Sequence, residues 1–257
     1  MNSIILKNEK QIELMHQSGQ LLARVFKMLD GYITAGISTM DINNKVEGFI
    51  VNDLKARPAS KGQYDFPFVL NASINEEVCH GMPNEHVLLK NGDIVNIDIT
   101  LEKNGYIADS STTYLIGEVS PHAKKLVAVT YQAMCKAIQL VKPGVRLGDI
   151  GHAIQSHAQT HNYSVVQEYC GHGIGEQMHE APQVLHFGRK NTGLILKEGM
   201  VFTIEPMINM GKRQCKVKKD GWTVITKDKK LSAQWEHTVA VTQDGYKVLT
   251  LRENEVI

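Results

Sequence analysis

The segment that most constrains the fold is NGDIVNIDITLEKNGYIADSSTTYLIG, residues 91–117. The dipeptide Asn104-Gly105 separates two alternating runs, which predicts two antiparallel strands joined by a tight turn. A two-residue type I′ turn requires positive φ at both central positions, and Asn and Gly are the residues that best tolerate it. Such a turn pairs Lys103 with Tyr106 and thereby sets the register of both strands.

This register brings two aspartates together. Asp98 falls opposite Ser111 and Asp109 opposite Thr100, so both carboxylates point to the same face as diagonal neighbours. Their Cα atoms are then roughly 7–8 Å apart, within reach of a shared ligand. A pair of carboxylates on a buried face is costly unless one is protonated or cations lie between them.

Two glutamates lie in similar surroundings in the second half of the chain. Glu205 follows the β-rich run GMVFTI and is stopped by Pro206, and Glu236 lies in the apolar segment SAQWEHTVAVT. Each glutamate alone is equally compatible with a salt bridge or with exposure on one face. Four acids in corresponding strands favour a shared site.

The helices predict an internal repeat. Apolar residues at helical spacing predict a helix over residues 9–30, and an S-x-x-D capping signal at Ser38 begins a second. The segment GISTMDINNKV at Gly36 resembles GVRLGDIGHAI at Gly144, 108 positions later. Five matches in eleven positions also arise by chance, but the acids nearly obey the same offset. We therefore expect one α+β domain over 1–257, whose pseudo-symmetric halves, about 9–120 and 121–250, face each other across one site.

Composition narrows the class of protein. With 28 Lys+Arg against 27 Asp+Glu, the chain offers no general reason to expect a nucleic acid or an anionic membrane as partner. Four scattered cysteines favour reduced thiols in a cytosolic compartment. The first residues suit neither a signal peptide nor a membrane span, so we expect a cytoplasmic protein without a membrane partner.

Three of the 11 histidines stand out. His172 lies between glycines in EYCGHGIGEQMHEAP, where we expect a loop with close backbone approach and no helix or regular strand. His179 follows in the same segment, and His80 ends a predicted strand in EEVCHGMP. The other histidines are expected at the surface or hydrogen-bonded in the core: His16, His86, His122, His152, His157, His161, His186 and His237.

One imidazole and four carboxylates make an oxygen-rich set, suited to Mn, Fe, Co, Mg or Zn ions. The set is too acidic for a structural zinc site. If two carboxylates bridge, five side chains can hold two ions about 3.5 Å apart, which lowers the pKa of a water and stabilises a tetrahedral intermediate. The candidate ligands are Asp98, Asp109, His172, Glu205 and Glu236.

The order D-x10-D, G-H-G-I-G, T-I-E-P and W-E-H-T-V resembles the type I methionine aminopeptidases over essentially the whole chain. The resemblance implies a pita-bread α+β fold, with antiparallel sheet and outer helices around a central site for two divalent ions (Co, Mn, Fe or Zn). It also implies removal of the initiator methionine from nascent polypeptides, near the ribosome and as a monomer.

The resemblance also assigns the ligands. It implies that Asp98 chelates the first ion, that Asp109 and Glu236 bridge both ions, and that His172 and Glu205 complete the second.

The resemblance assigns three catalytic residues, His80, His179 and Glu205. Glu205 shuttles a proton, and the two histidines contact the scissile amide and carbonyl. Only 33 residues separate His172 from Glu205, too few for the helical insertion of type II enzymes. A helix that begins near Glu9 leaves no room for a long N-terminal extension, so the chain resembles the short bacterial form.

The methionine pocket departs from the family pattern. Phe66 takes the place of one common tyrosine, Asn71 that of a cysteine, and Met178 that of an aromatic residue, while Trp222 matches a frequent tryptophan. We expect Phe66, Met178 and Trp222, with His80 and His179, to contact the substrate.

Three other functions are alternatives for a chain with these residues. Prolidases and Xaa-Pro aminopeptidases share the fold and the acids, but resemble longer chains with an added N-terminal domain. A dimetal phosphatase would need Arg or Lys beside the ligand motifs, and none stands there. Non-catalytic pita-bread binding modules have typically lost ligands, whereas all five candidates are present in this chain.

Overall fold

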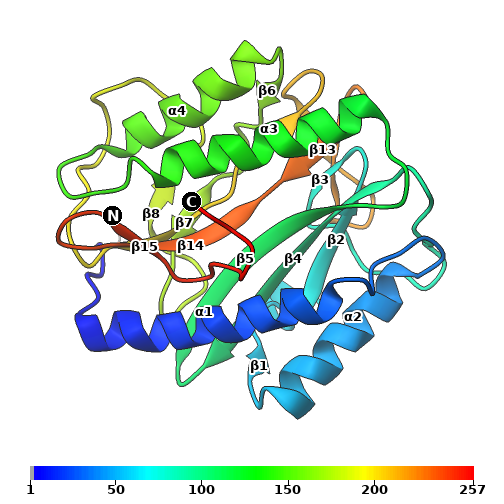
Figure 1. Ribbon diagram of the computed structural model, residues 1–257, viewed down its shortest axis with the longest axis horizontal. Coiled ribbons are helices and arrows are strands. Elements are labelled where there is room, and N and C mark those ends of the chain that lie inside the picture. The colour runs from blue at the N-terminus through cyan, green and yellow to red at the C-terminus, as the bar shows by residue number, and fades with distance from the viewer. Residues whose placement is uncertain (1–2) are drawn as a thin grey trace.

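The structure is a computed structural model that describes residues 3–257 (Figure 1). Its α-helices are α1 (Glu9–Leu29), α2 (Thr39–Gly48), α3 (Pro121–Ile138) and α4 (Leu147–Thr160). The nine-stranded main sheet has the order β1 (Arg57–Pro58), β4 (Ile94–Lys103), β5 (Tyr106–Leu115), β14 (Glu236–Val241), β9 (Val201–Ile204), β7 (Gly171–Gly173), β8 (Glu180–Val184), with β2 (Leu70–Ile74) on β4 and β15 (Tyr246–Val248) on β14.

Two three-stranded sheets and two short helical turns complete the fold. One sheet has the order β13 (Ser232–Gln234), β10 (Met207–Asn209), β6 (Ser164–Val165), and the other has the order β11 (Cys215–Val217), β12 (Val224–Thr226), β3 (Glu77–Cys79). The turns are the π-helical η1 (Phe49–Asp53) and the 3-10 turn η2 (Gln63–Asp65). The strands pair antiparallel, which confirms the predicted α+β class with an antiparallel sheet.

The hairpin of β4 and β5 has the predicted register. Asp98 pairs with Ser111 and Thr100 with Asp109. Asn104, in the turn, has a φ of 55°, the left-handed conformation that a type I′ turn requires. The turn chemistry therefore places the two aspartates on one face of the sheet.

The helices begin at side-chain caps. The Asn8 side chain accepts a hydrogen bond from the backbone N–H of Gln11 at the start of α1. Ser38 and Asp41 form the predicted capping box at the start of α2. No helix among the described residues is both long and apolar enough to cross a membrane.

Two hydrophobic cores lie between helices and sheet. α1 and α2 pack against the apolar faces of β2, β4 and β5, and α3 and α4 pack against β9, β14 and β10 (Figure 1). Along β4 the residues Ile97 and Ile99 are fully buried in the first core. Because side chains alternate across a strand, Asp98 points away from the helices, to the opposite face of the sheet.

The strands of the two cores meet where β5 pairs with β14. Glu236 pairs with Ser111, and His237 with Ser110. The predicted internal duplication and the domain boundaries stay predictions.

α1 also contacts the C-terminal segment at a point where only glycine fits. A Cβ at Gly19 would lie 2.1 Å from the carbonyl oxygen of Leu249, far inside van der Waals contact. At Gly48, which ends α2, the nearest atom to such a Cβ is Asn52 Nδ2 at 3.9 Å.

We expect Gly19→Ala to lower the free energy of unfolding by about 1–3 kcal/mol, because the clash with backbone outweighs the gain in helix propensity of about 1 kcal/mol. The matched variant Gly48→Ala should leave stability unchanged or raise it by up to about 1 kcal/mol. Urea unfolding followed by circular dichroism measures both. Equal effects of the two variants would contradict the close packing of α1.

Candidate metal centre

Five adjacent strands of the main sheet each carry one predicted metal ligand. In the sheet order, β4 carries Asp98, β5 carries Asp109, β14 carries Glu236, Glu205 follows β9 directly, and β7 carries His172. The structure therefore brings together residues that lie up to 138 positions apart in the chain, from 98 to 236.

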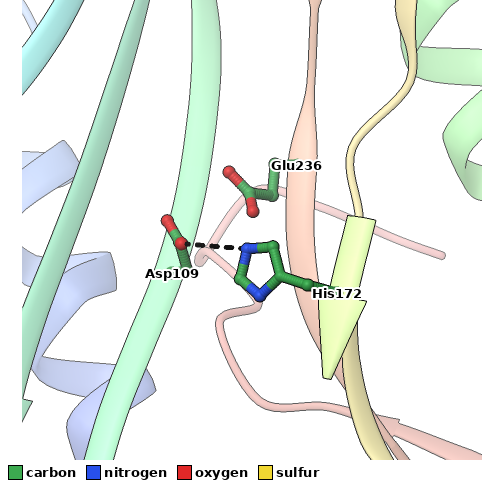
Figure 2. A group of neighbouring side chains, drawn as sticks. All are labelled: Asp109, His172 and Glu236. Atoms are coloured by element: carbon green, nitrogen blue, oxygen red, sulfur yellow. Dashed lines mark ion pairs between the residues drawn. The ribbon is translucent and has the colours of Figure 1, made fainter. Parts of the chain in front are cut away.

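The ligand atoms of these residues lie close together. His172 Nε2 is 3.8 Å from Asp109 Oδ2 and 3.6 Å from Glu205 Oε1. Asp109, His172 and Glu236 each offer a ligand atom, all within 4.8 Å of one another. Figure 2 shows these three side chains pointing toward a common point from three strands. Asp98 is within hydrogen-bonding reach of Asp109, which links it to the same cluster.

His172 lies in the short strand β7, so the expectation of no regular strand at this residue was wrong. β7 pairs with both β8 and β9, and its glycines allow this. A Cβ at Gly171 would lie 2.4 Å from the carbonyl oxygen of Thr203, and one at Gly173 would lie 2.2 Å from that of Ala181. The expected close backbone approach is thus confirmed, but it serves strand pairing.

The hydrogen bonds of His172 determine which nitrogen can bind a metal. Its Nδ1 lies 3.0 Å from the carbonyl oxygen of Gly173, which only accepts hydrogen bonds, so Nδ1 carries the proton. Burial lowers the pKa of His172 to about 3, so the ring is neutral near pH 7 and Nε2 presents a lone pair. This lone pair faces the carboxyl oxygens of Asp109 and Glu205, which is the arrangement of a metal ligand.

Burial raises the pKa of all four carboxyl groups. For Asp98 the pKa rises to about 6, and for Glu205 to about 8. The pKa values of Asp109 and Glu236 lie well above the ordinary range, first because of burial and then because of the neighbouring carboxylates. Four buried acids that repel one another are stabilised in their ionised form only by positive charge between them.

The site therefore fits divalent cations. Asp109 Oδ1 is buried and has no hydrogen-bond partner among residues 3–257, and the lone pair of His172 Nε2 has only carboxylates beside it. A cation satisfies both. The donor set of four carboxylates and one imidazole is the type that hard or borderline divalent ions prefer.

Glu205 is held by residues that the sequence interpretation did not select. The Thr203 hydroxyl donates to Glu205 Oε1 at 2.7 Å, and the backbone N–H of Glu205 donates to His186 Nε2 at 3.2 Å. His186 is fully buried, which agrees with the expectation that it lies either at the surface or hydrogen-bonded in the core. Its hydrogen bond with the backbone of Glu205 was not predicted. Alternation along β9 marks Thr203 as a neighbour of Glu205, whereas no sequence pattern marks His186.

The two histidines outside the ligand set lie at the edge of the site. His80 follows β3 with a φ of 56°, and burial, with a smaller effect from His179, lowers its pKa to about 4. The His179 ring lies 4.3 Å from the His172 ring and 5.6 Å from that of Tyr64, between centroids. Partial burial lowers the pKa of His179. Both histidines are therefore neutral near pH 7, and Tyr64 is a further residue that the sequence interpretation missed.

The predicted pocket residues fall into two places. The rings of Phe66 and Trp222 pack edge to face with centroids 5.0 Å apart. Asn71 pairs with Asp98 across β2 and β4, and its amide lies 3.5 Å from Asp98 Oδ2. Met178 is buried in a separate cluster beneath α1, although it directly precedes His179.

Comparison with known proteins decides the family. The model of metallopeptidase family M24 matches residues 13–243. The methionine aminopeptidase of Escherichia coli (strain K12) is 45% identical over 255 residues, 99% of this chain and 97% of its own. The crystal structure of methionine aminopeptidase from Rickettsia prowazekii has a TM-score of 0.95 and 48% identity, covering 97% of this chain and 100% of that chain. This chain belongs to metallopeptidase family M24, among the methionine aminopeptidases.

A more distant likeness extends the fold beyond this group. The prolidase from Pyrococcus horikoshii has a TM-score of 0.76 at 24% identity, and the match covers 98% of this chain but 65% of that one. These comparisons confirm the pita-bread fold. As a metallopeptidase of family M24, the chain binds divalent metal.

Metal should stabilise the protein more as the pH rises. A carboxyl group with a raised pKa keeps its proton in the folded state after the unfolded chain has released it, so the metal-free fold loses stability from about pH 4 upward. A divalent ion binds the ionised groups and removes this loss. We expect the gain in unfolding free energy on adding Mn²⁺ to chelator-treated protein to grow from pH 4 to pH 8, by about 1.4 kcal/mol per pH unit for each proton displaced.

Urea unfolding with Mn²⁺ or with chelator, at several pH values, measures this difference. Because both samples share every other titrating group, their difference isolates the site. A gain that does not depend on pH would contradict the cluster of buried carboxylates as the metal site.

Proposed function

We propose that this chain is a metal-dependent aminopeptidase that removes the initiator methionine from new polypeptides and prefers a small second residue. The observation that carries the proposal is the row of five candidate ligands on five adjacent strands, in a chain that matches methionine aminopeptidases over its full length. We further propose that it acts in the cytoplasm near the ribosome, where such substrates are made, and that it acts as a monomer.

We propose two divalent ions, Co, Mn, Fe or Zn. Asp98 would hold the first ion, Asp109 and Glu236 would bridge both, and His172 and Glu205 would complete the second. The strand order supports this division, because the two proposed bridging residues lie on the central strands β5 and β14, between Asp98 and the other pair. When bound, the ions lower the pKa of a water and stabilise negative charge on the substrate carbonyl oxygen.

Glu205 is the proposed proton carrier. It accepts a proton from the attacking water and passes it to the amine that leaves. The Thr203 hydroxyl occupies Oε1 and so fixes the orientation of the carboxylate. Burial raises the pKa of Glu205 to about 8 without metal, which supports a carboxyl group that takes up a proton near neutral pH.

The neutral histidines are the proposed donors to the substrate. His179 would donate to the carbonyl oxygen as it gains negative charge, and His80 would contact the scissile amide. Neutral imidazole donates through one N–H without placing a further positive charge beside His172. His80 directly follows β3, and its left-handed backbone conformation turns the chain away from the strand direction at this residue.

Phe66 and Trp222 support an apolar side-chain pocket. Their edge-to-face rings offer an aromatic surface on which a thioether packs well. Met178 is buried in the cluster beneath α1. It would line the pocket only because it directly precedes His179 in the chain. In such an apolar pocket we expect methionine to lead and leucine or norleucine to follow, while Asn71, whose amide lies beside Asp98, can admit a more polar side chain.

Competing peptides test the specificity. We expect Met-Ala-Ser to be cleaved fastest and Leu-Ala-Ser roughly 10–200-fold more slowly, since one methylene in an apolar pocket is worth about 1–3 kcal/mol. We expect little cleavage of Met-Lys-Ser, because its second residue is not small. Rates are measured by chromatography with metal-stripped protein reloaded with one ion at a time. Equal rates, or a preference for Leu or Xaa-Pro peptides, would refute the methionine assignment.

His179→Ala should lower kcat by about 10²–10³, because a donor to the developing oxyanion acts mainly in the transition state. KM and metal content should change little. Elemental analysis of the dialysed variant provides the control. If metal were lost and added metal restored the rate, His179 would be a ligand instead.

A further inference from the structure

Tyr64 lies over the ring of His179 at the edge of the metal centre. The two rings are stacked, with centroids 5.6 Å apart and an interplanar angle of 22°. The Tyr64 hydroxyl is 3.2 Å from His179 Nδ1. On the other side, the His172 ring meets His179 edge to face at 4.3 Å. His179 is therefore held between a tyrosine and a candidate metal ligand.

The loop that carries Tyr64 is held in an uncommon conformation. Tyr64 and the following Asp65 have φ values of 50° and 65°, a region that bulky residues rarely adopt. Two hydrogen bonds close the loop: Gly62 N–H donates to the Phe66 carbonyl at 2.7 Å, and Phe66 N–H donates to the Gln63 carbonyl at 2.9 Å. Such conformations persist where the surroundings enforce them, and they concentrate at functional sites.

The side chain of Tyr64 is not buried by this arrangement. It is 66% exposed, so the hydrophobic effect does not explain why the loop holds it there. Its described polar contact is with His179 alone. The loop is anchored next to the site by the hydrogen bond between Ser60 and Thr100, the residue that pairs with Asp109.

The contact at Nδ1 is compatible with two neutral forms of His179, and a phenol hydroxyl, which is a better donor than acceptor, favours the form in which it donates. A neutral imidazole has one N–H, and a hydroxyl that donates to Nδ1 leaves the proton on Nε2. Nε2 has no hydrogen-bond partner within residues 3–257, so this nitrogen is free for a substrate. In the opposite form, Nδ1–H donates to the hydroxyl and Nε2 presents a lone pair, which repels a carbonyl oxygen.

We propose that Tyr64 is a positioning residue that holds His179 in the Nε2–H form and fixes its ring plane, so that Nε2–H donates to the carbonyl oxygen of the scissile bond. The inference rests on the proposed function and deepens it. The stack controls the plane of the ring and the hydroxyl controls the position of the proton, so two substitutions separate the two effects.

Kinetics with Met-Ala-Ser separate these effects. Tyr64→Phe keeps the stack and loses the hydroxyl, and should lower kcat about three- to tenfold with KM nearly unchanged. Tyr64→Ala also loses the stack and should lower kcat further. Tyr246→Phe is the matched control, since its hydroxyl makes a hydrogen bond of the same 3.2 Å length, to the Ile257 carbonyl. This control should retain the kcat of the unaltered protein.

Nitrogen-15 NMR of zinc-loaded protein with labelled histidine reads the proton position directly, with the His179 signals assigned by His179→Gln. The unaltered chain should show a protonated Nε2, and Tyr64→Phe should show a mixture of forms or the Nδ1–H form. An unchanged form of His179 in Tyr64→Phe overturns the proposal. So does a rise in KM at constant kcat, which would make Tyr64 a substrate contact.

The two measurements distinguish this inference from the proposed function. If the unaltered protein fails to cleave Met-Ala-Ser, the function is wrong, yet the NMR comparison still tests what Tyr64 does to His179. If cleavage is normal and the NMR spectra of the two chains agree, the function stands and the role of Tyr64 is wrong.

Discussion

The pairing of β5 with β14 is the interaction on which the rest of the structure depends. It joins the strands of the two cores and places Asp109 and Glu236, on neighbouring strands, in one buried cluster. Hydrogen bonds on both strands hold it: the Ser110 hydroxyl donates to the Glu236 carbonyl at 2.7 Å, and the Thr238 hydroxyl donates to the Asp109 carbonyl at 2.8 Å. Main-chain and hydroxyl bonds thus oppose the repulsion between the carboxylates.

The C-terminal segment stabilises the pairing of β5 with β14. The partly buried Arg252 guanidinium donates to the Ser110 hydroxyl and to the Ser111 carbonyl, both at 2.8 Å, and packs over the Phe26 ring of α1. Arg252 also lowers the pKa of Glu236, against the larger effects of burial and of its acidic neighbours. One side chain therefore contacts both the first core and the pairing of β5 with β14, and its charge acts on Glu236.

Local chemistry made part of this architecture predictable. Asn104-Gly105 admits one tight turn, and that turn determines which face of the hairpin carries Asp98 and Asp109. The capping residues Ser38 and Asp41 mark a helix start for the same reason, since the hydrogen bonds involved span three residues. The acids could be recognised in the sequence because burying a carboxylate in an apolar strand is costly unless a partner binds it.

What could not be predicted depends on partners distant in the chain. The strand at His172 exists because β8 and β9 pair with it, and its glycine-rich sequence alone reads as a loop. The surroundings of Met178 are set by the packing of α1, and the stack of Tyr64 on His179 is set by the left-handed backbone of its loop. None of these contacts leaves a periodic trace in the sequence.

We propose that the five ligands on adjacent strands hold two divalent ions with two bridging carboxylates. Anomalous diffraction from crystals of the Mn²⁺-loaded protein, recorded at the manganese edge, tests this arrangement. We expect two peaks about 3.5 Å apart, both contacted by Asp109 and Glu236, one by Asp98 and the other by His172 and Glu205. A single peak under saturating metal, or a peak whose ligands lie outside these five residues, would contradict it.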